Sequence, residues 1–304
     1  FSCRPCRYRA RRAGDAYLQI AGKQGLHASD ISLDVGDLGF DPFIAKKPLF
    51  PRDPERREID DDARDGDAHL SKRLGAIGLR ATTITADGNV GSDQFIDPIT
   101  CECCPTAAAA TARGPVVVYR DRVTSDGVAP KEVRGDSGSV RDIHLARLEN
   151  GKWTPPKRVH ADNWVINACP DNGPAVDARD ERLVVAWWTA ADNRPRVLAA
   201  FSSDAGDSFT PPIPIDAGAP NGQVTVALMP DGRSAVVGWQ EKGQAWARWV
   251  SADGALGQPL ALGASPGRSR LPRWLAQGDG VLATWTSQEK GAQAVRVSHL
   301  VVKD

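Results

Sequence analysis

A short apolar segment that ends in an aromatic residue occurs four times in this chain, each time after a turn rich in Gly, Asp or Glu. The copies are VVVY at 116–119, VVAW at 184–187, VVGW at 236–239 and LATW at 282–285. Each unit of roughly 45 to 65 residues has room for about four short strands, which is the periodicity of a β-propeller blade. We therefore expect an all-β fold with units at 106–161, 174–217, 223–263 and 270–304, preceded by a half unit at 75–98.

A second repeat lies within these units. The segment SSDAGDSFTPP at 202–212 and the segment LENGKWTPP at 148–156 both follow an apolar strand, and both read as turn, aromatic residue and Thr-Pro-Pro. Weaker copies of the turn occur at 85–88 and 251–254. Asp or Asn before Gly favours a tight hairpin turn. An α/β alternative is excluded because no segment has a sustained apolar period of about 3.6 residues.

The pattern Ser202-x-Asp204-x-Gly206-x-Ser208-Phe209 resembles the Asp-box, or BNR, repeat of sialidase-like propellers. In that family the box lies between the third and fourth strands of a blade, on the face opposite the ligand. The resemblance implies a sialidase-like β-propeller over residues 74–304. We expect six blades, with the ring either incomplete here or closed irregularly by an N-terminal arm.

Residues 1–73 differ in composition from the rest of the chain. They include 27 charged residues and no Trp. Such a segment buries too little apolar surface to offset the entropy cost of ordering the chain. We expect an irregular or disordered N-terminal arm.

The residues with the most chemistry fall within 101–174. Cys101, Cys103 and Cys104 precede the first strand of one unit, and Cys169 precedes the first strand of the next. Because successive strands alternate in direction, the segment before strand one and the loop after strand two lie on the same face. We therefore expect one ligand face that spans two neighbouring blades near the central channel.

Two main roles are open for the four cysteines. Thiolates suit a zinc or copper(I) site. One or two disulfides, for example from Cys169 to one of the three upstream cysteines, would instead tie adjacent blades in an extracytoplasmic protein. A reactive thiol is a third alternative.

Tyr119, Arg120, Asp121, Arg141 and Asp142 end one strand and begin the next. Arg-Asp pairs at strand ends commonly hold loops in place. Arginine also suits bidentate binding of a ligand carboxylate. The resemblance implies that a hydrolase of this family would use a tyrosine nucleophile, an aspartate acid/base and three arginines on the substrate carboxylate, and these five residues are the catalytic candidates. Trp164, Asn167 and Asn172 are the expected ligand contacts.

The remaining bulk properties narrow the class of partner. The chain has 38 basic and 38 acidic residues, so no global field attracts nucleic acid. No apolar run approaches the roughly 18 residues that span a membrane, and the basic start lacks the apolar core of a signal peptide. We expect a periplasmic or secreted monomer that binds a small molecule or glycan, or a metal, at 101–174. An exo-α-sialidase and a purely structural propeller with crosslinked blades are the alternatives.

Overall fold

The computed structural model describes residues 78–84, 89–101, 103–123, 139–166, 168, 170–265, 273–278, 280–289 and 292–301. In these residues the chain is all-β apart from one turn of 3-10 helix, η2 (Ala191–Asn193). None of the described residues forms a helix long and apolar enough to cross a lipid bilayer. The expected N-terminal arm at 1–73 and the turn at 85–88 lie outside the described residues.

The strands form four consecutive antiparallel sheets, each ordered along the chain, and one separate ribbon. The first sheet contains β3 (Ala107–Thr111), β4 (Gly114–Arg120), β5 (Ile143–Glu149), β6 (Lys152–Trp153) and β7 (Lys157–Arg158). The second contains β8 (Ala175–Arg179), β9 (Arg182–Thr189), β10 (Arg196–Ser202) and β11 (Ile213–Pro214). The third contains β12 (Pro220–Leu228), β13 (Ser234–Glu241), β14 (Gln244–Ser251) and β15 (Leu260–Ala264). The fourth contains β16 (Arg273–Gln277), β17 (Gly280–Glu289) and β18 (Ala292–Val301), and the ribbon pairs β1 (Leu79–Ala81) with β2 (Gln94–Asp97).

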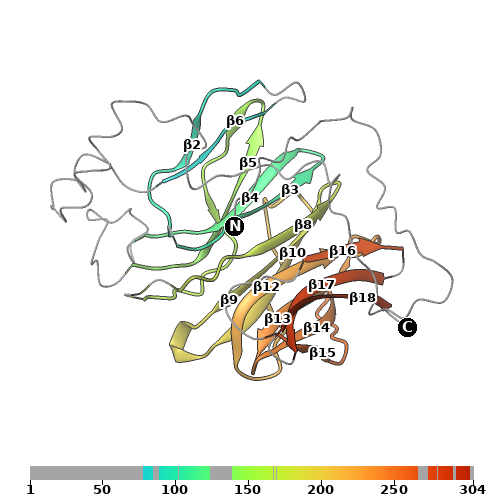
Figure 1. Cartoon of the computed structure of the whole chain (residues 1–304). Helices are drawn as coiled ribbons and strands as arrows, with labels where there is room; N and C mark the ends of the chain where they lie inside the picture. The colour runs from blue at the N-terminus through green and yellow to red at the C-terminus, as the bar shows by residue number, and fades with distance from the viewer. Residues whose placement is uncertain are drawn as a thin grey trace, which may run out of the picture.

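Neighbouring sheets pack face to face through shared apolar cores. Leu145 of the first sheet packs with Trp187 of the second, and Phe201 of the second packs with Trp239 of the third. Each residue of β13 is buried, because the second and fourth sheets cover its two faces. Figure 1 shows the sheets following one another in chain order. This serial stacking of antiparallel meanders is a β-propeller architecture, as predicted, while six blades and ring closure stay predictions.

The Thr-Pro-Pro repeat has the same hydrogen bonds in two sheets. Thr154 N–H donates to the carbonyl of Arg147 at 2.8 Å, and its hydroxyl accepts Arg147 N–H at 3.0 Å. Thr210 makes the same pair of bonds to Phe201 at 2.8 Å and 3.1 Å. The prolines that follow lack an N–H, so strand pairing is interrupted before it resumes at β7 and β11. Two stretches 56 positions apart thus perform one structural task.

The turn at residues 202–209, which has the sequence pattern that resembles an Asp-box, is held by the hydroxyl of Ser202. Ser202 Oγ donates to Asp204 Oδ1 at 2.7 Å and accepts the N–H of Gly206 at 2.9 Å. Ser251 Oγ likewise donates to Asp253 and accepts the N–H of Ala255 at 3.1 Å. These turns connect β10 to β11 and β14 to β15, the third and fourth strands of their sheets. This is the position that the resemblance implied.

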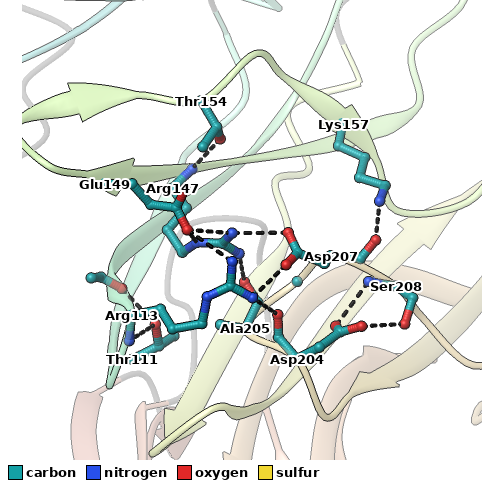
Figure 2. A network of polar contacts seen from close by, with 12 residues as sticks. Thr111, Arg113, Arg147, Glu149, Thr154, Lys157, Asp204, Ala205, Asp207 and Ser208 are labelled. Atoms are coloured by element: carbon teal, nitrogen blue, oxygen red, sulfur yellow. Dashed lines mark hydrogen bonds and ion pairs between the residues drawn. The ribbon is translucent and has the colours of Figure 1, made fainter.

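Arg147 on β5 ties the Asp-box turn of the second sheet to the first sheet (Figure 2). The Arg147 side chain is 3% exposed and donates to Asp207 Oδ1 at 2.8 Å. It also donates to the carbonyl of Ala205. Arg113, in the turn between β3 and β4, reaches Asp207 and the carbonyl of Asp204 from a more exposed position. The turn is therefore also an inter-sheet contact, which the sequence did not indicate.

Candidate functional site

The segments singled out in the sequence converge at the end of the first sheet opposite the Asp-box turns. Cys101 N–H donates to the carbonyl of Arg120 at 3.0 Å, and Asp121 N–H donates to the carbonyl of Asp142 at 3.0 Å. Arg141 Nη1 donates to Cys101 Sγ at 3.2 Å. The cysteine segment, the end of β4 and the residues before β5 are thus joined by direct hydrogen bonds.

Arg120 is an internal tie between the first two sheets. It is 1% exposed. Its Nε donates to the carbonyl of Asn172 at 3.0 Å, its Nη1 to that of Arg141 at 2.5 Å and its Nη2 to that of Trp188 at 2.6 Å. The guanidinium carbon lies 4.9 Å from the centroid of the Trp164 ring. Each nitrogen of the guanidinium is bound to a backbone carbonyl, so the group supports this region from inside.

Asp142 positions the loop that carries Trp164. Its Oδ1 accepts Trp164 N–H at 3.1 Å and its Oδ2 accepts Asn163 N–H at 3.0 Å. Arg158 Nη1 lies 3.4 Å from Oδ2. Burial raises the pKa of Asp142, and the two backbone N–H bonds oppose that shift. Arg141 N–H donates to the carbonyl of Trp164 at 2.8 Å, so both residues of the Arg-Asp pair anchor the same loop.

The three clustered cysteines bring their sulfur atoms together. The Sγ of Cys101 lies 3.1 Å from that of Cys104 and 3.6 Å from that of Cys103, and the other two are 4.0 Å apart. Cys101 and Cys104 are buried thiols, while Cys103 is half-buried and disulfide-bonded. If all three were thiolates, their spacing would suit one zinc ion, since Zn–S bonds of about 2.3 Å place tetrahedral sulfurs roughly 3.8 Å apart.

The two buried thiols, Cys101 and Cys104, differ in acidity. A hydrogen bond from Cys104, together with the charges of Arg141 and Arg120, lowers the pKa of Cys101 to about 6 despite its burial. The same hydrogen bond, with burial, raises the pKa of Cys104. The pair is therefore best described as a Cys101 thiolate that accepts a hydrogen bond from the Cys104 thiol.

Tyr119 and Asp121 belong to a buried acidic cluster. Tyr119 Oη donates to Asp97 Oδ2 at 2.7 Å, and His144 Nδ1 lies 3.4 Å from Asp121 Oδ2. Burial, with the charges of Asp97 and Asp121, raises the pKa of Tyr119. Burial and the charge of Asp97 raise the pKa of Asp121 to about 7, and burial lowers that of His144 to about 4. The cluster can hold a proton near neutral pH, and the tyrosine is kept protonated.

An open cavity of about 580 Å³ lies beside this region, between the ends of the second and third sheets. Trp164 and Trp188 contribute aromatic rings to its wall, and their rings meet edge to face at 5.2 Å. Apart from Asp171, the remaining lining residues are small or apolar or carry neutral amides and hydroxyls: Ile166, Pro170, Asn172, Pro195, Ala219, Pro220, Asn221, Gln223, Gln240, Gly243 and Ser265. Asp171 is the one charged side chain among the described residues that line it.

Asn172 connects the cavity wall to the buried hydrogen bonds of Arg120. Its Oδ1 accepts Gln223 N–H at 3.0 Å, and its Nδ2 donates to the carbonyl of Asn221 at 3.4 Å. Its own carbonyl accepts the bond from Arg120. Gly222 leaves room for the Asn172 side chain, because a Cβ at position 222 would lie 2.2 Å from Asn172 Oδ1. The φ of Gly222 is +102°, a conformation that favours glycine. Asn172 thus joins three sheet ends at the cavity wall.

The predicted ligand contacts and the predicted catalytic residues separate in space. Trp164 and Asn172 line the cavity although both are largely buried, whereas the five catalytic candidates, which are buried as well, are not among its lining residues. Asn167 and Cys169 lie outside the described residues. The sequence reasoning missed Trp188 and Gln223. The Trp187-Trp188 doublet is a signal that could have found the first, since neighbouring strand residues face opposite sides and Trp187 is core.

Comparison with known proteins does not assign a family. No family model matches the chain, and no curated protein matches it. Similar solved structures include hydrazine synthase of Kuenenia stuttgartiensis, with 12% identity, a TM-score of 0.47 and coverage of 74% of this chain and 57% of that one. The GH43 protein BlXynB of Bacillus licheniformis has 11% identity, a TM-score of 0.39 and coverage of 64% and 39%. The Aleuria aurantia lectin in complex with α-methyl-L-fucoside has 13% identity, a TM-score of 0.42 and coverage of 74% of each chain.

The chain spans less than two thirds of the first two of these structures. At these identities and TM-scores the similarities do not bear on function, and the assignment of the fold rests on the sheets and their shared cores.

Proposed function

We propose that this chain is a glycan-binding module whose site is the cavity lined by Trp164 and Trp188, and that it takes a neutral sugar. The observation that carries the proposal is the combination of two tryptophan rings with neutral amide side chains in one open cavity. Its volume of about 580 Å³ falls in the range of small-molecule sites.

The lining chemistry supports a polyhydroxylated, uncharged ligand. Trp188 Nε1 donates to the carbonyl of Pro220 at 2.9 Å, which leaves the ring as an apolar wall against which a sugar face can pack. The amides of Asn221 and Gln223 can donate and accept hydrogen bonds at the same time, as sugar hydroxyls require. An anionic ligand would find no arginine or lysine among the described lining residues.

The same contacts weigh against hydrolysis of a sialoside. Arg120 and Arg141 donate to groups inside the protein instead of facing the cavity. Tyr119 has a raised pKa, whereas an attacking tyrosine needs activation. The disulfide at Cys103 suits an oxidising compartment, so we expect the module to act outside the cytoplasm. We also expect it to act as a monomer.

The test is binding of the full chain to a panel of immobilised neutral and sialylated oligosaccharides, compared between two tryptophan variants. Trp188→Leu should weaken binding of neutral oligosaccharides roughly thirtyfold, since a central aromatic contact contributes about 2 kcal/mol. Trp246→Leu is the matched control, because Trp246 is also half-buried and also donates its N–H to a carbonyl, that of Glu241 at 3.2 Å, but does not line the cavity.

Binding that is equal in the two variants, or absent from the whole panel, would refute the proposal. Turnover of a fluorogenic sialoside that is lost in Tyr119→Phe would replace it with a hydrolase function.

A further inference from the structure

Two buried side chains of the cavity wall carry polar atoms that are open to a partner from solution. Gln240 is 4% exposed and Trp164 is 5% exposed, and both line the cavity. Within the part of the chain that the structure describes, Gln240 Oε1 accepts no hydrogen bond and Trp164 Nε1 donates none. Neither atom is fully enclosed by protein. Because an unpaired polar atom of a buried side chain is costly, a ligand that pairs with both atoms gains affinity.

The amide of Gln240, in β13, is held as a hydrogen-bond acceptor. Its Nε2 donates to Ser265 Oγ at 2.8 Å, and Ser265 is 2% exposed and also lines the cavity. The backbone N–H of Ser265 in turn donates to the carbonyl of Gly243 at 2.9 Å. These bonds fix the plane of the Gln240 amide, so Oε1 is an acceptor in a defined position at the cavity wall.

The indole of Trp164 is held as a hydrogen-bond donor. Its backbone N–H donates to Asp142 Oδ1 at 3.1 Å, and its carbonyl accepts Arg141 N–H at 2.8 Å. The guanidinium carbon of Arg120 lies 4.9 Å from the centroid of the indole, and the Trp188 ring meets the indole edge to face at 5.2 Å. An indole nitrogen donates and does not accept. The cavity therefore offers one buried acceptor and one buried donor, each on a positioned side chain.

An amide is the ligand group that pairs with both atoms. An ammonium group has only donors and would leave Trp164 Nε1 unpaired, and a carboxylate has only acceptors and would leave Gln240 Oε1 unpaired. An acetamido group has one N–H, one carbonyl oxygen and an apolar methyl group. Trp188, whose Nε1 already donates to the carbonyl of Pro220 at 2.9 Å, gives that methyl group an apolar surface. A sugar hydroxyl pairs with either atom but brings no apolar contact.

We propose that the cavity selects neutral sugars that carry an acetamido group, the N-acetylhexosamines, with the acetamido N–H donating to Gln240 Oε1 and its carbonyl accepting from Trp164 Nε1. This inference rests on the glycan-binding function proposed above and narrows its ligand class. Sialic acids also carry an acetamido group, but their carboxylate meets no arginine or lysine among the described lining residues and is repelled by Asp171.

The test compares ligands that differ only in this group. Isothermal titration calorimetry of the full chain gives the dissociation constants of two pairs: di-N-acetylchitobiose with cellobiose, and the methyl glycosides of N-acetylgalactosamine and galactose. Within each pair the sugar framework is the same and an acetamido group replaces a hydroxyl. One net hydrogen bond changes a dissociation constant about fivefold, so the acetamido sugar should bind about 30-fold more tightly in at least one pair.

Three variants separate these contacts from a general effect on the fold. Gln240→Leu and Trp164→Phe each remove one of the two hydrogen bonds and should lower the affinity ratio to about fivefold. Trp188→Phe is the matched control, because it also removes an indole N–H from the cavity wall, but one that bonds to the protein. It should weaken both members of a pair alike and leave the ratio unchanged, since a structural loss common to both ligands cancels in the ratio.

Measurable binding with a ratio near one in both pairs would overturn this inference and leave the glycan proposal unaffected. A ratio that Gln240→Leu and Trp164→Phe do not change would also overturn it, as would tighter binding of the methyl glycoside of N-acetylneuraminic acid than of any neutral sugar. Absence of binding to every sugar would refute the proposed function, and this inference with it.

Discussion

Arg147 offers a direct test of how the first and second sheets are held together. Its side chain is 3% exposed and binds Asp207 at 2.8 Å and the carbonyl of Ala205. Hydrogen bonds to a charged group contribute about 1.5–3 kcal/mol each, and breaking a buried ion pair costs about 3–5 kcal/mol. The Asp207 side chain is 47% exposed and regains water when its partner is lost, which lowers the cost.

We therefore expect Arg147→Met to lower the free energy of unfolding by about 2–3 kcal/mol. Methionine keeps the apolar stem packed, so the loss reports the polar contacts (Figure 2). Urea unfolding measures it, and an unchanged slope against urea would show that the folded state is intact. Arg113→Met removes a contact to the same Asp207 from a side chain that is 36% exposed. This substitution should lower the free energy of unfolding much less, because salt and solvent screen an exposed ion pair. An Arg147→Met chain as stable as the Arg113→Met chain would refute this reasoning.

Further predictions concern the pH dependence of stability and the contact between Gly222 and Asn172 at the cavity wall. Burial and the charge of Asp97 raise the pKa of Asp121 to about 7 in the folded chain, so its stabilising contribution is complete below about pH 4 and is lost as pH rises to about 7. Asp121→Asn should remove that decline in urea unfolding at several pH values, and an unaltered profile would contradict it. Burial lowers the pKa of His144 to about 4, so its contribution is present above about pH 6.5 and is lost as pH falls through 4, and His144→Gln should remove that acid-side loss. Gly222→Ala places a Cβ against the Asn172 amide and should weaken binding of neutral oligosaccharides. Unchanged affinity would show that the position of the Asn172 side chain does not affect binding.

The blade pattern was predictable because its signals are local. The bonds of Thr154 to Arg147 and of Thr210 to Phe201 join residues within ten positions of each other, so the repeat in sequence is also a repeat in hydrogen bonding. The prediction of an all-β propeller architecture is confirmed by the sheets that these repeats form.

Which residues of 101–174 face the cavity and which support it from inside was not predictable in the same way. The three acceptors of Arg120 are the carbonyls of residues 141, 172 and 188. No local sequence pattern indicates that each nitrogen of the guanidinium donates to a backbone carbonyl. The cavity likewise depends on residues of two further sheets, such as Trp188 and Gln223. A residue type at a strand end predicts what chemistry is available, whereas its packing partners decide whether it faces the ligand.

The most direct test of the central claim is a crystal structure of the full chain with the neutral oligosaccharide that it binds most tightly in the panel. We predict a sugar ring against Trp188 and Trp164, with its hydroxyls on the amides of Asn221 and Gln223. A sugar bound away from this cavity, or one seated at Tyr119, would contradict the account.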